Sequence, residues 1–466
     1  MSEPRPSLWS TLVEAVRGTE QDLTQVPVSR AVLLLSVPTV LEMSMESLFA
    51  IVDMYFVSRL GDDAVATVGL TESLLALMYA MAMGLSAAAT AVIARRTGAQ
   101  DHDGAASAAV QVIAIAVVMS LVFGALGVVL APSLLRVMGA EPGVLAMGVG
   151  YTRTMLGGSA TIFLLFVINA SFRGAGDAAV AMRSLWLANL VNMALAPCFI
   201  FGLGPIPAMG VTGAGVATTI SRALGVLYQV VMLRRAGARL AISRKHLAID
   251  LATIRELMNI AWGAALQMLI ETASWLGLVR ILSTFGSKAL AGYTIAMRVA
   301  MFALLPPFGF ANAAAALVGQ NLGAKQPDRA EQSVKTVARY NVVFLGAVGL
   351  VFVLVPQWFV GRFAEDAASL AVGTQALRIV ALGFAFFAYG MVAIQAFNGA
   401  GDSTTPMLLN LASFWFFKIP CAYVLARVVG MGPAGVFWAI AAAYTVQSIA
   451  ASLLFRRGKW KTKVIA

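Results

Sequence analysis

Long apolar runs recur along the whole sequence. The run from Ala106 to Leu135 contains no charged residue, and only 12% of the chain is charged. A helix that crosses a bilayer needs about 20 mostly apolar residues, whereas a soluble domain carries about 25% charged residues. The composition therefore excludes an ordinary cytosolic enzyme, a disordered protein and a secreted disulfide scaffold. The sequence predicts an all-α polytopic membrane protein.

Twelve apolar stretches are long enough to cross a membrane. They cover residues 31–58, 66–94, 106–130, 147–171, 178–202 and 211–233, and then 256–282, 291–318, 332–356, 371–397, 403–427 and 433–455. They divide the chain into a cytoplasmic N-terminal segment (1–30), a first six-helix half (31–233), a basic cytoplasmic linker (234–255), a second six-helix half (256–455) and a basic cytoplasmic tail (456–466).

The N-terminal segment carries one short amphipathic pattern. Leu8, Trp9, Leu12, Val13 and Val16 fall on one helical face. Such a face is typical of a helix that lies on the membrane surface. An ordered N-terminal segment without a function of its own fits the same pattern.

The net charge of +11 comes largely from basic clusters between the spans. These clusters are Arg95–Arg96, Arg234 to Lys245, Lys325 to Arg339 and Arg456 to Lys463. If the chain crosses the membrane twelve times, all four clusters lie on the same side of the membrane as the two termini. Lysine and arginine gather on the cytoplasmic side of membrane proteins, so we expect both termini in the cytoplasm of a bacterial inner membrane. The charge then requires no nucleic-acid partner.

The two halves match at one constant offset, which carries each position of the first half onto an equivalent position of the second. Gly174-Ala175-Gly176-Asp177 returns as Gly399-Ala400-Gly401-Asp402, and Glu46 returns as Glu271. Because six spans per half is an even number, both halves enter the membrane from the same side. The repeat therefore predicts a pseudo-two-fold axis along the membrane normal, which is a transporter architecture with the substrate path between the halves.

Three acids interrupt the first span. A charge at the bilayer centre costs about 2.5–3.5 kcal/mol, yet this span holds Glu42, Glu46 and Asp53. At 100° per residue, Glu46 lies about 40° and Asp53 about 20° round the helix from Glu42. Such a stripe must face a wet cavity or a partner helix, where it can bind a cation or hold a proton. Alternatively, an acid pairs structurally with an intramembrane base, for which Arg222, Arg298 and Lys418 are candidates.

Further polar residues extend this pattern into the fifth and seventh spans. Glu271 and Gln267 share one face of the seventh span and predict a substrate site or a second-half cation site. A buried structural hydrogen bond is the alternative for Glu271. Asn189 and Asn192 can bond a neighbouring helix or offer oxygens to a small cation, so Asp53 and Asn192 are candidate ligands of a sodium ion.

No other chemistry is indicated. The sequence lacks a phosphate-binding loop of the Walker type, and His102 and His246 lie in polar connections without a metal cluster. We therefore expect no cofactor, no catalytic residue and no enzymatic activity. An ion gradient must supply the free energy for transport.

Four stretches carry a family resemblance: Val52 to Gly61, Arg173 to Asp177, Gly210 to Ala214 and Val318 to Ala324. With them, the chain resembles the multidrug and toxic compound extrusion (MATE) family over nearly its whole length. The resemblance implies efflux of organic cations and other amphipathic drugs in exchange for H⁺ or Na⁺.

The family's functional positions carry over unevenly. Asp53 falls on the family's first-span aspartate, which is implicated in cation coupling. Asn192 falls on the asparagine of the family's Asn-x-x-x-Asp pair, but the aspartate position is Ala196. Glu271 falls on the seventh-span acid of one branch, whose tenth-span acid has no counterpart in residues 385–393. Our hypothesis is that Glu42 and Glu46 substitute for the missing aspartate.

The sequence thus predicts a monomeric secondary antiporter that exchanges cationic or amphipathic small molecules for H⁺ or Na⁺ and contacts membrane lipid. One alternative is a lipid-linked precursor flippase of the same superfamily, which would need a basic cavity. Another is an exporter of one dedicated metabolite. A channel is disfavoured, because pores usually form around an axis of identical subunits.

Overall fold

The structure is a computed structural model that describes residues 7–19, 21–203, 206–235, 239–364 and 366–463. Parts of all five expected segments lie outside the described residues. They are 1–6 and 20 of the N-terminal segment, 204–205 of the first half, 236–238 of the linker, 365 of the second half, and 464–466 of the tail.

The described chain is helical. A short helix, α1 (Leu8–Arg17), precedes the first half. The first half comprises α2 (Val28–Ser58), α3 (Asp62–Gly98), α4 (His102–Val137), α5 (Pro142–Gly157), α6 (Ser159–Gly174), α7 (Ala178–Phe201) and α8 (Val211–Arg234). The turn η1 (Arg244–Leu247) lies in the connection to the second half.

The second half repeats this order with more interruptions. It comprises α9 (Leu251–Ser283), α10 (Ser287–Gly323), α11 (Pro327–Leu354), α12 (Pro356–Val360), α13 (Ala367–Leu382), α14 (Phe384–Gly399), α15 (Thr404–Asn410), η2 (Leu411–Lys418), α16 (Ile419–Tyr423), η3 (Val424–Val428), α17 (Pro433–Arg456) and η4 (Lys459–Thr462). The segments η2 and η3 are π-helical turns within one continuous span.

Eleven spans among the described residues are long and apolar enough to cross a membrane, and the bent pair α13–α14 supplies a twelfth. That pair bends by 55° at Gly383. Gly158 breaks the corresponding span of the first half, between α5 and α6. The two glycines are equivalent positions of the repeat, so the repeat extends to the breaks inside the spans.

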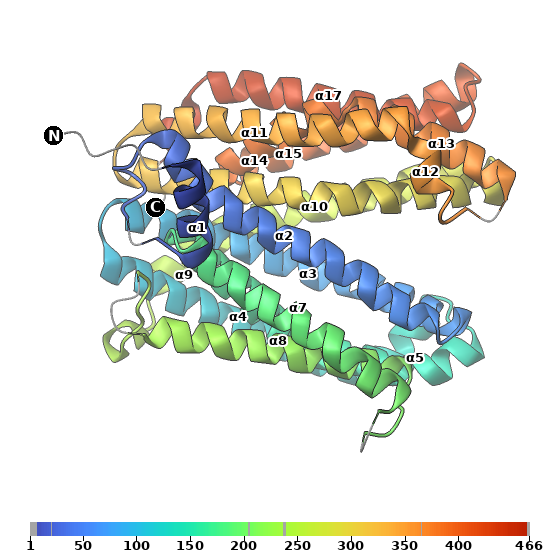
Figure 1. The fold of residues 1–466 in the computed structure, drawn as a ribbon, viewed down its shortest axis with the longest axis horizontal. Helices are drawn as coiled ribbons and strands as arrows, with labels where there is room; N and C mark the ends of the chain where they lie inside the picture. The colour runs from blue at the N-terminus through green and yellow to red at the C-terminus, as the bar shows by residue number, and fades with distance from the viewer. Residues whose placement is uncertain (1–6, 20, 204–205, 236–238, 365, 464–466) are drawn as a thin grey trace.

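The two halves form two lobes that lie side by side (Figure 1). Equivalent bonds recur in each lobe: Arg153 Nε donates to the Val128 carbonyl at 3.1 Å, and Arg378 Nε donates to the Val353 carbonyl at 3.2 Å. The repeat predicted from the sequence is therefore present in three dimensions.

The lobes meet through reciprocal contacts, as a two-fold axis requires. A Cβ on Gly98 of α3 would lie 1.9 Å from the Gln320 carbonyl oxygen of α10. A Cβ on Gly323 of α10 would lie 2.0 Å from the Arg95 carbonyl oxygen of α3. Arg95 and Gln320 are themselves equivalent positions of the repeat. This geometry confirms the predicted fold class of two six-helix halves related by a pseudo-two-fold axis.

This contact lies at the end of the molecule that also holds α1 (Figure 1). Two further bonds join the lobes there: Gln320 Nε2 donates to the Gly174 carbonyl at 2.9 Å, and Arg95 Nη2 donates to the Ala400 carbonyl at 3.4 Å. Glycine is needed at 98 and 323 because the two backbones touch. The lobes are therefore closed together at the α1 end.

Candidate functional site

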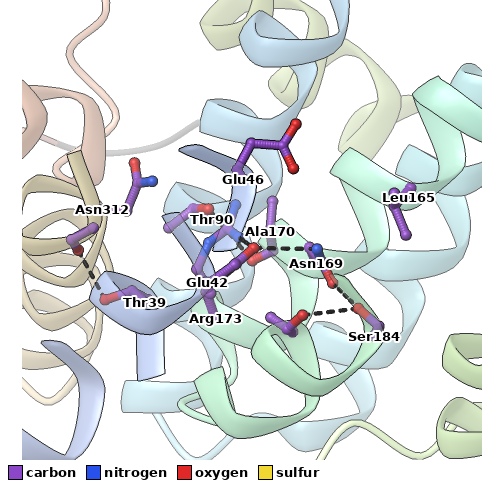
Figure 2. Close-up of polar contacts among 12 residues, drawn as sticks. Thr39, Glu42, Glu46, Thr90, Leu165, Asn169, Ala170, Arg173, Ser184 and Asn312 are labelled. Atoms are coloured by element: carbon purple, nitrogen blue, oxygen red, sulfur yellow. Dashed lines mark hydrogen bonds and ion pairs between the residues drawn. The ribbon is translucent and has the colours of Figure 1, made fainter. Parts of the chain in front are cut away.

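Glu42 forms a buried ion pair in the first lobe. The side chain lies on α2, and the residue is 1% exposed. Its Oε1 accepts hydrogen bonds from Arg173 Nη1 at 2.8 Å and from Asn169 Nδ2 at 3.2 Å, both on α6 (Figure 2). This ion pair supports, for Glu42, the alternative raised by the sequence, in which an acid of the first span pairs structurally with a buried base. The partner is Arg173, however, and none of the three bases that the sequence singled out.

The Glu42 pair belongs to a polar network between α6, α7 and α8. Asn169 Oδ1 accepts from Ser184 Oγ at 2.7 Å and from Gln229 Nε2 at 2.6 Å. Buried polar groups are stable when such partners satisfy them, although Glu42 Oε2 and Gln229 Oε1 have no hydrogen-bond partner among the described residues. The network therefore anchors Glu42 and leaves it few ways to move.

Glu46 is placed differently from Glu42. Figure 2 shows its carboxylate pointing away from the Glu42–Arg173 pair. It is half-buried, and its Oε2 accepts a hydrogen bond from Asn189 Nδ2 of α7 at 3.0 Å. Arg222 of α8 also acts on it electrostatically. Asn189 therefore bonds a neighbouring helix, which is one of the two roles expected for it, and its partner there is an acid.

Asp53 has no hydrogen bond to its buried Oδ1 atom from any described residue. Its charged neighbours are Arg222 and Glu72 of α3. Arg222 is 9% exposed and donates to the Tyr79 hydroxyl at 3.2 Å. A buried carboxylate oxygen without a partner costs free energy. Binding a proton or a cation at Asp53 would remove that cost.

Asn192 forms its hydrogen bond with a residue other than Asp53. It is buried, and its Nδ2 donates to Thr218 Oγ1 of α8 at 2.9 Å. Over the described ranges no hydrogen bond joins it to Asp53, and no group of three acidic, histidine or cysteine side chains could hold a metal ion. The suggested sodium site at Asp53 and Asn192 remains a prediction.

The second lobe holds its own acid and base. Glu271 is half-buried on α9, and Lys418 and Tyr444 are its electrostatic neighbours. Lys418 is 1% exposed, and its Nζ lies 4.1 Å from the centre of the Phe414 ring. The Trp415 indole donates to the Ile270 carbonyl at 3.0 Å and so fixes η2 against α9 beside Glu271.

Gln267 is bonded to neighbouring helices of the second lobe. Its Nε2 donates to Asn398 Oδ1 at 3.1 Å and to the Ser403 carbonyl at 3.0 Å. These bonds join α9 to α14 and to the turn before α15. Gln267 therefore tethers helices, and its assignment to a substrate or cation site stays a prediction.

Sequence reasoning missed two partners. Arg173 was noticed only as the first residue of a stretch that carries the family resemblance, although its position at the end of a span was a signal for pairing with Glu42. Tyr79 was not considered, because a tyrosine in an apolar run carries no distinctive signal. Neither contact follows from spacing, since the partners come from different helices.

Comparisons with known proteins agree with this arrangement. The MatE family model matches residues 38–198 and 264–424, more than half of the chain. The chain belongs to the MatE family. The resemblance to MATE transporters seen in the sequence is thereby confirmed, and the protein is a member of a multidrug efflux transporter family.

Relatives and solved structures of this family cover nearly the whole chain. A probable multidrug resistance protein NorM of Thermotoga maritima is 26% identical over 92% of this chain and 93% of its own. An FAD transporter of Shewanella oneidensis is 26% identical over 86% of this chain and 80% of its own. A structure described as the outward-facing conformation of a multidrug resistance MATE family transporter has a TM-score of 0.88 and 26% identity, and covers 95% of this chain and 98% of its own.

The two MatE segments contain every candidate site residue. Glu42, Glu46, Asp53 and Asn192 lie in the first segment, and Gln267 and Glu271 lie in the second. Arg222, the base beside Asp53, lies between them. The MatE match therefore covers the acids of both lobes.

Proposed function

We propose that this protein is a proton-coupled antiporter that exports cationic or amphipathic molecules. The observation that carries the proposal is the buried Oδ1 of Asp53, which has no hydrogen-bond partner among the described residues. A proton bound there removes the charge. Release of that proton restores a carboxylate that can attract an organic cation, so proton and substrate favour different states.

The resident bases support H⁺ over Na⁺ as the coupling ion. Arg222 is the base that acts on Asp53, and Lys418 is the base that acts on Glu271. A guanidinium or ammonium beside each acid opposes the binding of any cation there, and a sodium ion would in addition need several oxygen ligands. A proton changes the charge of the acid without needing a shell of oxygen ligands. Each lobe is therefore better suited to protonation than to sodium binding.

We further propose that both termini lie in the cytoplasm of a bacterial inner membrane and that the chain works as a monomer. The basic clusters at the α1 end support this orientation. In that orientation the closed α1 end would face the cytoplasm, so this conformation would be outward-facing. Bound substrate would leave from between the lobes at the opposite end.

The test uses purified protein in liposomes. A fluorescent organic cation such as ethidium is followed under a proton gradient and, separately, under a sodium gradient. We expect transport with the proton gradient alone and loss of transport in Asp53→Asn. The control is Asp366→Asn, which alters an exposed helix cap. Transport driven only by sodium would reject proton coupling, and an active Asp53→Asn variant would reject Asp53 as the coupling residue.

A second candidate is the export of one dedicated anionic metabolite or lipid-linked precursor. The buried bases Arg222 and Lys418 favour it, because either could pair with a phosphate, and one relative is named as an FAD transporter. Uptake of radiolabelled FAD into the same liposomes distinguishes the candidates. FAD transport without ethidium transport would favour the dedicated exporter.

A further inference from the structure

A pocket of about 420 Å³ lies at the C-terminal end of α9. It lies between the last turns of α9 and the span that contains η3. Its lining consists of Arg280, Ile281, Thr284, Tyr423 and Arg427. We call these five residues the arginine pocket. It is distinct from the Asp53 and Glu271 sites, and the proposed transport cycle does not use it.

The arginine pocket carries uncompensated positive charge. Within the described part of the chain, neither Arg280 nor Arg427 forms an ion pair with a carboxylate. The Arg427 guanidinium stacks 4.7 Å above the centre of the Phe285 ring, which holds it in place. Two guanidinium groups lining one pocket without an acid favour an anionic ligand.

The pocket belongs to the second lobe alone. The first-lobe positions equivalent to Arg280 and Arg427 are Tyr55 and Gly202. Both arginines therefore break the repeat at the same place. Basic residues are also scarce at this end of the spans, so the convergence of two of them in one pocket is not a by-product of the duplication.

The surroundings indicate a bilayer surface. Leu276, one turn before Arg280, is 67% exposed, and Val428, next to Arg427, is 71% exposed. Apolar side chains this exposed on a membrane span are suited to contact with acyl chains. The pocket therefore combines a lining suited to an anion with a flanking apolar surface, at the end of a span, where phospholipid headgroups would be expected.

We propose that the arginine pocket binds the phosphate of an anionic phospholipid. The guanidinium groups of Arg280 and Arg427 would clamp the phosphate oxygens, and the Tyr423 hydroxyl can donate a further bond. The Thr284 hydroxyl already donates to the Ile281 carbonyl at 2.6 Å, so it can only accept, for instance from a headgroup hydroxyl. The acyl chains would run along the exposed apolar face beside Leu276 and Val428.

Native mass spectrometry of the detergent-purified protein tests the proposal. The probes are phosphatidylglycerol and phosphatidylcholine with identical acyl chains. We expect phosphatidylglycerol to be retained several-fold more than phosphatidylcholine. The double variant Arg280→Gln/Arg427→Gln should lose this preference.

The matched control is Arg59→Gln/Arg362→Gln. These arginines also stack on aromatic rings, Tyr55 and Trp358, but do not line the pocket. The control should retain phosphatidylglycerol as the unaltered protein does. Equal retention by the pocket variant and the unaltered protein would overturn the proposal. The single variant Arg280→Gln provides the same comparison if the double variant does not fold.

A titration with inorganic phosphate separates a lipid headgroup from a free anion. If the lipid is the ligand, millimolar phosphate should leave bound phosphatidylglycerol in place, because the acyl chains add apolar contact. Complete displacement by phosphate would assign the pocket to a free phosphate group and reject the lipid. Because no transport is measured, these results are independent of the proposed antiport.

Discussion

Arg173 Nη1 lies 2.8 Å from Glu42 Oε1, inside the first lobe. The equivalent positions of the second lobe are Asn398 and Gln267, whose amide groups bond to each other at 3.1 Å. The same two places in the repeat therefore hold an ion pair in one lobe and a neutral pair in the other. Both pairs connect the first span of a lobe to the end of its fourth span.

This equivalence predicts the effect of removing and restoring the pair. Arg173→Ala should destabilise the protein by about 3–5 kcal/mol, because it leaves the Glu42 carboxylate buried and uncompensated. The double variant Glu42→Gln/Arg173→Asn copies the second lobe and should recover most of that loss. Thermal unfolding in detergent measures both. A double variant as unstable as Arg173→Ala would show that the two sites are not interchangeable.

Removing Lys418 should change ion selectivity. The corresponding position in the first lobe is Met193, so Lys418→Met supplies an uncharged side chain that the repeat already uses. Glu271 would then lack the Lys418 ammonium group beside it and could bind a sodium ion instead. We expect sodium to stimulate ethidium transport in this variant and not in the unaltered protein. Lys418→Arg, which keeps the charge, should remain insensitive to sodium.

The reciprocal glycine contact predicts a shift in conformation. Gly98→Ala places a methyl group 1.9 Å from the Gln320 carbonyl oxygen. Overpacking of this kind costs about 1–3 kcal/mol, and the cost applies only while the lobes are closed at the α1 end. We therefore expect the variant to favour the state that is open at this end.

Distances between spin labels, measured by double electron–electron resonance spectroscopy, can detect that shift. Labels at His102 and Lys325, in a Cys198→Ser/Cys421→Ser background, report on the two lobes at the α1 end. The control is Gly346→Ala, where the new Cβ would have nothing within 4 Å. If Gly98→Ala and Gly346→Ala give the same distance distribution, the contact does not control closure.

Arg329 should hold the N-terminal segment against the second lobe. Its Nη2 donates to the Leu23 carbonyl at 2.9 Å and also to the Val26 carbonyl. Hydrogen bonds from charged groups contribute about 1.5–3 kcal/mol. Arg329→Gln should therefore speed amide exchange in residues 21–27 by roughly tenfold or more. Lys335→Gln, on the same helix but paired with Glu331, should leave that exchange unchanged.

Helical spacing could place the acids of α2 on one face, but it could not show what each of them faces. Glu42 reaches Arg173, Glu46 reaches Asn189, and Asp53 comes under the influence of Arg222. Each partner lies far along the chain on another helix. The sequence pointed to Arg222, Arg298 and Lys418 as pairing bases because they lie within spans, and so overlooked Arg173 at a span end.

The sequence alone determined the membrane class, the order of the spans, the duplication and the family, because these depend on apolar length, on a constant offset and on local motifs. Only the tertiary structure decided which acids are bonded and which oxygen of Asp53 is left without a partner. A helical period defines the direction of a side chain on its own helix. The packing of α2 against α6, α7 and α8 decides which residues that side chain contacts.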